Sequence, residues 1–275
     1  IKIMKINYFI YIFVFLLFSF TIRAETLIKG EIIAGGILII KTLPNSIVKL
    51  DDNIVPISDN GYGLIGFERK PKNIQKLKIV SPTNQTEEIT LNIKNRSYKI
   101  QKIDGLEKEK VEPPKELLDR IYNEKIRVKK SRNEANSLKT PYYLNGFVMP
   151  VKGPITGVYG SQRILNGVPK SPHYGLDIAL PTGHNIKAPM DGVIIFTDND
   201  LFYSGGTIII AHGQGLSTSY LHLSKILVEK NQKVRKGDII GKVGATGRVT
   251  GAHLHWGVEW MGKRLDPEYL IKLFD

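Results

Sequence analysis

The sequence predicts a mainly β protein in which two β-rich parts are joined by a helix. Short runs rich in β-branched residues recur along most of the 275-residue chain between glycine, proline and asparagine, and one charged segment interrupts them. This length is enough for two moderate domains with cores of their own. We therefore expect a small N-terminal β-domain at 25–105, a helical linker at 106–140, and a C-terminal antiparallel β-sandwich or open barrel at 141–275.

The first residues have the composition of an export signal at 1–24. Lys2 and Lys5 precede an apolar run at 8–20, and the small residue Ala24 follows before the first acidic residue. The run is short for a membrane span, although an uncleaved anchor is the alternative. We expect an exported protein of the periplasm or cell envelope whose mature chain begins near Glu25.

The charge and composition exclude several classes of function. The formal net charge is +13, and because residues 1–24 hold three basic and no acidic residues, the mature chain keeps +10. A nucleic-acid groove would interleave basic residues with stacking aromatics, and the sequence has no such pattern. Anionic envelope polymers are the better match, with a merely solvating lysine-rich surface as the alternative. Since cysteine is absent, disulfides, thiolate zinc sites and cysteine nucleophiles are excluded.

The segment 106–140 is charged and has helical periodicity. Leu118, Tyr122 and Ile126 recur every four residues, a proline pair precedes them, and basic residues crowd the end of the segment. We expect one amphipathic helix whose apolar stripe packs on a neighbouring domain and not on a membrane.

Two of the six histidines alternate within the stretch "AHLHWGVEW". On a strand, successive side chains point to opposite faces, so His253, His255 and Glu259 share one face while the intervening leucine, tryptophans and valine fill a core. Two neutral imidazoles held together usually share a cation or a proton-transfer task. Taken alone the pair is a weak signal, because ordinary polar roles explain most such pairs.

Two further segments supply groups of the same chemistry. In "STSYLHLSK", alternation predicts Tyr220 and His222 on one strand face; in "SPHYGLDIALP", the proline and glycine place His173 in a turn and Asp177 at the entry to a strand. A catalytic zinc site takes three protein ligands and leaves one position open, and imidazole with carboxylate suits zinc. His173, Asp177 and one of the paired histidines would complete such a set.

The motifs "HYGLD", "YLHLS" and "GAHLHWGV", in this order, resemble those of the lysostaphin/LytM-type zinc metallopeptidases, which cut peptide bonds in bacterial peptidoglycan. The resemblance covers about residues 147–267. It implies three Zn²⁺ ligands: His173, Asp177 and His255. It also implies a free catalytic pair, His222 and His253.

The resemblance implies a role for each member of this pair. Zinc lowers the pKa of a bound water towards about 7, so that His253 would take its proton and pass it to the leaving amine. His222 would donate a hydrogen bond to the developing oxyanion, although the two roles could be exchanged. Tyr220 would orient His222 or touch substrate in the groove, with simple packing as the alternative.

Other motifs are better explained by structure than by chemistry. His184 and His212 adjoin turn glycines and match no ligand position, so we expect them to be structural residues in a loop or groove. "GATGRVTG" lacks the ending of a phosphate-binding loop. "APMDG" lacks the lysine that a biotinyl or lipoyl carrier would modify.

These observations favour an exported zinc endopeptidase that hydrolyses peptide cross-links of peptidoglycan during wall growth, remodelling or division. The alternative is a non-catalytic wall-binding regulator that activates other hydrolases; such proteins typically lack a metal ligand, whereas this sequence has all three. Wall hydrolases and division proteins are candidate partners, and the oligomeric state is not predicted. Autoinhibition by the segment 106–140 is a further hypothesis from its position in the chain.

Overall fold

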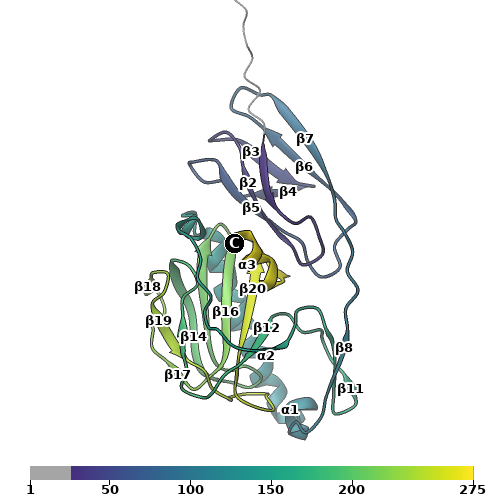
Figure 1. Ribbon diagram of the computed structural model, residues 1–275, viewed down its shortest axis with the longest axis vertical. Helices are drawn as coiled ribbons and strands as arrows, with labels where there is room; N and C mark the ends of the chain where they lie inside the picture. Colours follow the sequence, from purple (N-terminus) through teal and green to yellow (C-terminus); the bar gives the residue numbers. More distant parts are fainter. Residues whose placement is uncertain (1–25, 275) are drawn as a thin grey trace, which may run out of the picture.

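The computed structural model describes residues 26–274, in which an N-terminal β-domain lies against one end of a larger C-terminal domain (Figure 1). The predicted export signal at 1–24 lies outside the described residues. Within 26–274, none of the helices has the length and apolar character needed to cross a bilayer.

The N-terminal domain consists of two antiparallel sheets. The first contains β1 (Leu27–Gly30), β2 (Ile37–Lys41) and β5 (Tyr62–Gly66). The second has the order β4 (Asn53–Val55), β3 (Ile47–Leu50), β6 (Ile74–Val80) and β7 (Thr86–Asn92). The sequence of β6 alternates as a half-buried strand should: Gln75, Leu77 and Ile79 are buried and the residues between them are exposed. These sheets enclose the first part of the core.

The C-terminal domain is built on an eight-stranded antiparallel sheet with a smaller sheet packed on one face. The large sheet contains β9 (Ile155–Gly157), β12 (Leu176–Ala179), β14 (Gly192–Leu201), β15 (Gly205–Gly213), β16 (Leu216–Leu223), β18 (Lys233–Val234), β20 (His253–Trp260) and β21 (Lys263–Leu265). The small sheet contains β13 (Asn185–Lys187), β17 (Lys225–Ile226) and β19 (Ile239–Lys242). Its strands do not close the large sheet into a barrel. The prediction of a mainly β protein with an antiparallel sandwich is therefore confirmed.

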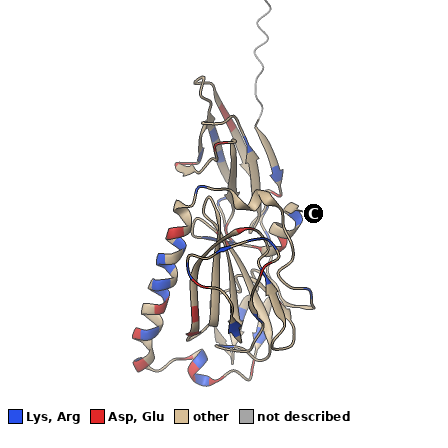
Figure 2. Ribbon diagram, turned by 90° about the vertical axis from the view of Figure 1, so that its left-hand side faces the viewer, with Lys and Arg blue, Asp and Glu red and all other residues tan. Residues whose placement is uncertain are grey.

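The helix α2 (Lys115–Ser137) covers part of the opposite face of the large sheet (Figure 2). Val128 and Ala135 pack with Phe196 and Ile209 of β14 and β15 in a second apolar cluster. Because α2 covers one face and the small sheet the other, β15 is buried along its whole length, which explains its nearly continuous apolar sequence.

The prediction that the apolar stripe of α2 packs on a neighbouring domain is wrong. Leu118, Tyr122 and Ile126 are 48%, 63% and 45% exposed. The helix is held in a different rotation by ion pairs from Arg120 and Arg127 to acidic residues of β14 and by the small buried side chains of its second half. Periodicity located the helix, but these tertiary contacts decide which of its faces meets the sheet.

One strand that precedes the helix belongs to the C-terminal domain by its pairing. β8 (Ile100–Ile103) pairs in parallel with β10 (Gln162–Leu165), and β11 (Val168–Pro169) completes this three-stranded sheet. The side chain of Asn166 exchanges two hydrogen bonds with the backbone of Leu106, at 3.2 and 2.7 Å. The chain then forms the short helix α1 (Lys108–Val111) before α2 begins. The segment around β8 thus becomes a wall of the C-terminal domain.

The two domains share one continuous core. The C-terminal helix α3 (Pro267–Phe274) packs on β1, β2 and β20, which places the chain end at the junction in Figure 1. Beside it, the buried carboxylate of Asp266 pairs with Arg96 at 2.7 Å. The 3₁₀ turn η1 (Tyr142–Asn145) also contributes, since Tyr143 donates a 2.5 Å hydrogen bond to Gln214. Gln214 in turn donates to two carbonyls of the N-terminal domain.

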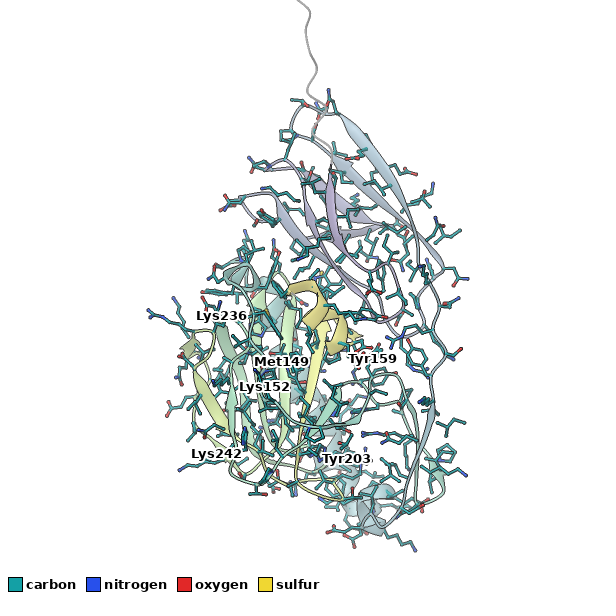
Figure 3. All side chains as sticks on the ribbon, viewed as in Figure 1. Met149, Lys152, Tyr159, Tyr203, Lys236 and Lys242 are labelled. Carbon is teal, nitrogen blue, oxygen red and sulfur yellow. The ribbon has the colours of Figure 1, made fainter. Side chains whose placement is uncertain are left out.

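Aromatic side chains fill the space between the large sheet and the segment around β8. Tyr159, labelled in Figure 3, is 2% exposed and makes edge-to-face contacts with Tyr98 and Tyr174. Its hydroxyl donates a 2.8 Å hydrogen bond to the carbonyl of Arg264. This packing fixes the loops that lead into β10 and β12, which carry the candidate site.

Candidate active site

Three side chains predicted as metal ligands converge on one face of the large sheet. Asp177 of β12 pairs directly with His255 of β20, so both side chains point to the same side. His173 precedes β12 in an irregular segment, as predicted from its proline and glycine neighbours. His173 Nε2 lies 3.0 Å from both His255 Nδ1 and Asp177 Oδ1, and the last two atoms are 2.8 Å apart. The ligand atoms of all three residues fall within 4.8 Å of one another.

The hydrogen bonds around this group fit a metal ion. His173 Nδ1 lies 3.0 Å from the carbonyl of Val158; because a carbonyl only accepts, Nδ1 carries the proton and Nε2 is left with its lone pair towards the cluster. His255 turns its Nδ1 inward, and its Nε2 lies so close to Gly175 that a Cβ there would approach it to 2.6 Å. Two imidazoles and a carboxylate, in a chain without thiolates, form a donor set that suits zinc.

The carboxylate of Asp177 is ionised despite its burial. Burial opposes its charge, but the adjacent imidazoles of His173 and His255 hold the pKa of Asp177 well below its usual value. Its second oxygen accepts a 2.7 Å hydrogen bond from Arg163 of β10. Burial lowers the pKa of Arg163, and Asp177 partly offsets this effect. The sequence alone predicts no role for Arg163. Its only signal in the sequence is its position in the stretch "GVYGSQR", which precedes His173.

The remaining two histidines of the motifs lie beside the metal group. The ring centroids of His222 and His253 are 4.9 Å apart, and His253 Nε2 lies 3.7 Å from Asp177 Oδ1. Both rings donate a hydrogen bond from Nδ1 to a backbone carbonyl, His222 to Thr246 at 2.8 Å and His253 to Gly251 at 2.9 Å. Each neutral ring therefore presents Nε2 as an acceptor. Burial, followed by the neighbouring imidazoles, lowers the pKa of His222 to about 3.

The prediction that Tyr220 and His222 share a strand face is wrong. Tyr220 pairs with Trp256 on the core side of the sheet, is fully buried, and lies 2.8 Å from the hydroxyl of Thr218. His222 has a positive φ of 67°, and the ladder between β15 and β16 is irregular at this end. This left-handed residue turns the imidazole out of the regular alternation and onto the face of His255. Tyr220 is thus a core residue and does not line a substrate groove.

A hollow of about 170 Å³ opens beside the metal group. Asp177, His222 and His253 line one side of it. The opposite side is formed by the segment around β8, through Gln101, Ile103 and Leu106, and by the loop at 248–250. Sequence reasoning missed this wall because β8 lies far from the motifs in the chain and its parallel pairing with β10 has no local signature.

The two other histidines described belong neither to the metal group nor to the lining of this hollow. His184 is exposed in the turn before β13. His212 is fully buried in β15, between the carbonyl of Asp191 and the hydroxyl of Thr218, each at 2.7 Å. Burial lowers its pKa to about 4. The structural role expected for His212 fits these contacts, although it lies in a strand and not in a loop.

The fold and the site together are those of a metallopeptidase domain: an antiparallel sandwich carries a His–Asp–His metal group with two acceptor imidazoles beside it. Residues 171–267 match the sequence model of peptidase family M23, and the C-terminal domain belongs to this family. The resemblance to lysostaphin/LytM-type enzymes is thereby confirmed for this domain.

Relatives named as peptidoglycan endopeptidases match a part of this chain. Peptidoglycan DD-endopeptidase ShyA of Vibrio cholerae serotype O1 is 51% identical over 96 residues, which are 34% of this chain and 22% of ShyA. Peptidoglycan DD-endopeptidase ShyB of the same organism is 40% identical over 114 residues, 42% of this chain and 24% of ShyB. The match thus spans less than a quarter of either relative.

One solved structure matches over both domains. A crystal structure described as peptidase M23 from Pseudomonas aeruginosa is 29% identical, with a TM-score of 0.66. The alignment covers 90% of this chain and 97% of that chain. The arrangement of N-terminal β-domain, helix and C-terminal sandwich therefore has a counterpart in another protein of known structure.

Proposed function

We propose that this protein is an exported, zinc-dependent endopeptidase that hydrolyses peptide cross-links of bacterial peptidoglycan. The observation that carries the proposal is the convergence of His173, Asp177 and His255 beside His222 and His253 in an open hollow. The relatives named peptidoglycan DD-endopeptidases support this substrate. The apolar run at 8–20 and the basic mature chain support a place in the periplasm or cell envelope, next to an anionic wall.

Zinc held by His173, Asp177 and His255 would supply a Lewis acid that polarises the scissile carbonyl and lowers the pKa of a water molecule. Arg163 would hold the second oxygen of Asp177, which keeps that carboxylate ionised and oriented. The segment around β8 and the loop at 248–250 would flank the peptide and limit the access of bulk water.

We assign the proton transfer to His253. Its Nε2 is an acceptor that faces Asp177, and it is the less buried of the two free histidines, so it can take a proton from the attacking water and deliver it to the leaving amine. The expected role of His222 is to donate a hydrogen bond to the oxyanion. This role does not fit the structure, because the one N–H of the neutral ring donates to the Thr246 carbonyl. A neutral His222 would instead accept a hydrogen bond from the water and orient it.

The test measures bound zinc and the release of soluble peptides from purified peptidoglycan. The wild-type chain is expected to bind one zinc ion and release peptides, and His255→Ala is expected to lose both. His184→Ala is the matched control, because this histidine is exposed and does not belong to the metal group. A zinc-loaded wild type that releases no peptide would contradict the enzyme proposal and support the regulatory alternative.

A further inference from the structure

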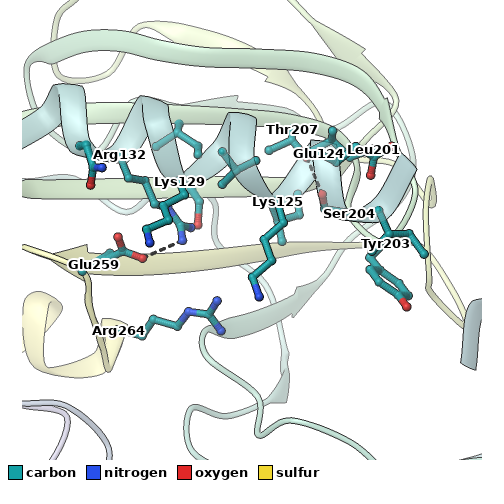
Figure 4. Close-up of a pocket in the computed structure, with 17 residues that line it drawn as sticks. Glu124, Lys125, Lys129, Arg132, Leu201, Tyr203, Ser204, Thr207, Glu259 and Arg264 are labelled. Atoms are coloured by element: carbon teal, nitrogen blue, oxygen red, sulfur yellow. Dashed lines mark hydrogen bonds and ion pairs between the residues drawn. The ribbon is translucent and has the colours of Figure 1, made fainter. Parts of the chain in front are cut away.

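Helix α2 forms the roof of a second hollow on the same sheet face as His255. This hollow has a volume of about 510 Å³ (Figure 4). Its roof includes Lys125, Val128, Lys129 and Arg132 of α2; its floor includes Leu221 and Glu259 of β16 and β20. We call it the helix-roofed pocket. Residues 115–137, which form this roof, precede the region that matches family M23.

The helix-roofed pocket adjoins a smaller hollow that reaches the metal group. This smaller hollow of about 150 Å³ is lined by His255 and Gly257, and it shares Leu221, Glu259 and Arg264 with the helix-roofed pocket. Since alternate residues of a strand are about 7 Å apart, Glu259 lies roughly 13 Å from His255 along β20. Gly257 has no side chain, so none projects from β20 between them, and the Ser219 hydroxyl lies over it, 2.6 Å from where a Cβ would stand. A peptide bound at the metal could therefore extend under α2.

The cations of the helix-roofed pocket outnumber its acids. Four basic residues line it, and both acidic residues are already engaged: Glu259 pairs with Arg132 at 2.7 Å, and Glu124 with Arg120 at 2.7 Å. Lys125, Lys129 and Arg264 have no ion-pair partner among residues 26–274. In Figure 4, the side chain of Lys125 extends from the helix towards the side on which Arg264 lies.

A helix that served only to cover the sheet would place apolar residues over this floor. Here Lys125, Lys129 and Arg132 lie above it, and the buried Nε of Arg132 has no hydrogen-bond partner within the described part of the chain. The floor itself is partly apolar, through Ile209 and Leu221. Cations around a low-dielectric floor attract anions more strongly than the same cations on an open surface. The pocket thus fits a ligand with small apolar groups and carboxylates.

We propose that the helix-roofed pocket is a subsite for the carboxylate-bearing part of a peptide that crosses the metal centre. This inference rests on the proposed function and deepens it, because it assigns an acidic peptide to one side of the scissile bond. Lys125, Lys129 and Arg264 bind the carboxylates, while the aliphatic floor contacts the peptide's small side chains. The hollow beside His222 and the segment around β8 receives the other side.

Peptide binding is the first test, because it does not require catalysis. The probe is a fluorescein-labelled, cross-linked muropeptide with free carboxylates, compared with the same muropeptide converted to methylamides. Fluorescence anisotropy on the zinc-free protein measures Kd for the wild type and for a Lys125→Gln, Lys129→Gln double variant. The control carries Lys115→Gln and Lys130→Gln, which remove the same charge from the same helix outside the pocket. Glutamine preserves helix propensity, so both variants keep α2.

The double variant is expected to bind the free-carboxylate probe about tenfold more weakly, while the control stays within about twofold of wild type. The methylamide probe should bind all three proteins alike, and weakly. Equal loss in the control, or equally tight binding of the methylamide probe by wild type, would overturn the subsite.

Cleavage by the zinc-loaded proteins separates this inference from the function on which it rests. The double variant should raise KM for the free-carboxylate muropeptide about tenfold and leave kcat nearly unchanged. Cleavage by wild type with no change in KM for the double variant would refute the subsite alone. Charge-selective binding without any cleavage would refute the proposed function and leave the subsite supported.

Discussion

Gly157→Ala tests the geometry of the metal group without removing a ligand. Gly157 of β9 lies next to Asp177, and a Cβ at this position would stand 2.3 Å from Asp177 Oδ2 and 2.9 Å from its Cγ. A carbon and an oxygen that are not bonded need roughly 3.3 Å, so the carboxylate must move by about 1 Å or the strand must shift. Either movement also disturbs the 2.7 Å bond to Arg163.

The expected result is a loss of zinc affinity of about 10- to 100-fold, the range seen when groups that orient a ligand are altered. Peptide release should fall by about 100-fold at limiting zinc, since a 1 Å misplacement is costly at a reacting centre. Competition with a chelator of known affinity measures zinc binding, and thermal unfolding of the zinc-free protein monitors the fold.

Gly251→Ala provides the matched control. This glycine lies two residues before His253, yet a Cβ there would meet no atom within 4 Å. Both substitutions restrict the unfolded backbone to the same extent, so their difference isolates the contact with Asp177. If Gly157→Ala bound zinc as tightly as Gly251→Ala, the reasoning that the bare Gly157 backbone makes room for the carboxylate would be refuted.

Two further predictions concern buried residues away from the metal. Tyr220→Phe should lower the free energy of unfolding in urea by about 1 kcal/mol, because the hydrogen bond with Thr218 is lost, and should leave kcat/KM unchanged. A large loss of activity would show that Tyr220 acts in the substrate groove after all. His212 has a folded pKa of about 4, below its unfolded value of 6.5, so the unfolded chain takes up a proton first as pH falls. The contribution of His212 to the free energy of unfolding, about 3 kcal/mol, is complete above pH 6.5 and is lost towards pH 4. His212→Gln should lack this part of the pH dependence. If the free energy of unfolding of both proteins fell equally with pH, the lowered pKa of His212 would be contradicted.

Strand alternation explains why much of the site was predictable. In β20, His253 and His255 face the site while Leu254 and Trp256 fill the core, as the two-residue period requires. Asp177 and His255 then meet because antiparallel pairing places them opposite one another. Both features depend on regular backbone, which local sequence encodes well.

The missed features depend on irregular backbone or on distant contacts. The positive φ of His222 is an exception to alternation, and only Gly, Asn and Asp commonly signal that conformation in a sequence. The rotation of α2 follows from ion pairs with β14, which lies more than seventy residues away. The side of the hollow that β8 forms depends on the parallel pairing of β8 with β10, two strands that are joined by a long crossover. Tertiary packing, and not local sequence, determines such pairs.

The core shared by the two domains has a mechanical consequence. Separating them would expose the apolar residues around α3 to solvent, a penalty of several kcal/mol. Large hinge rotation, common in enzymes whose lobes touch through small polar surfaces, is therefore disfavoured. Entry of the proposed peptide substrate would then depend on local adjustment of side chains and loops around the two hollows. A truncated chain lacking residues 26–92 should expose apolar surface and aggregate.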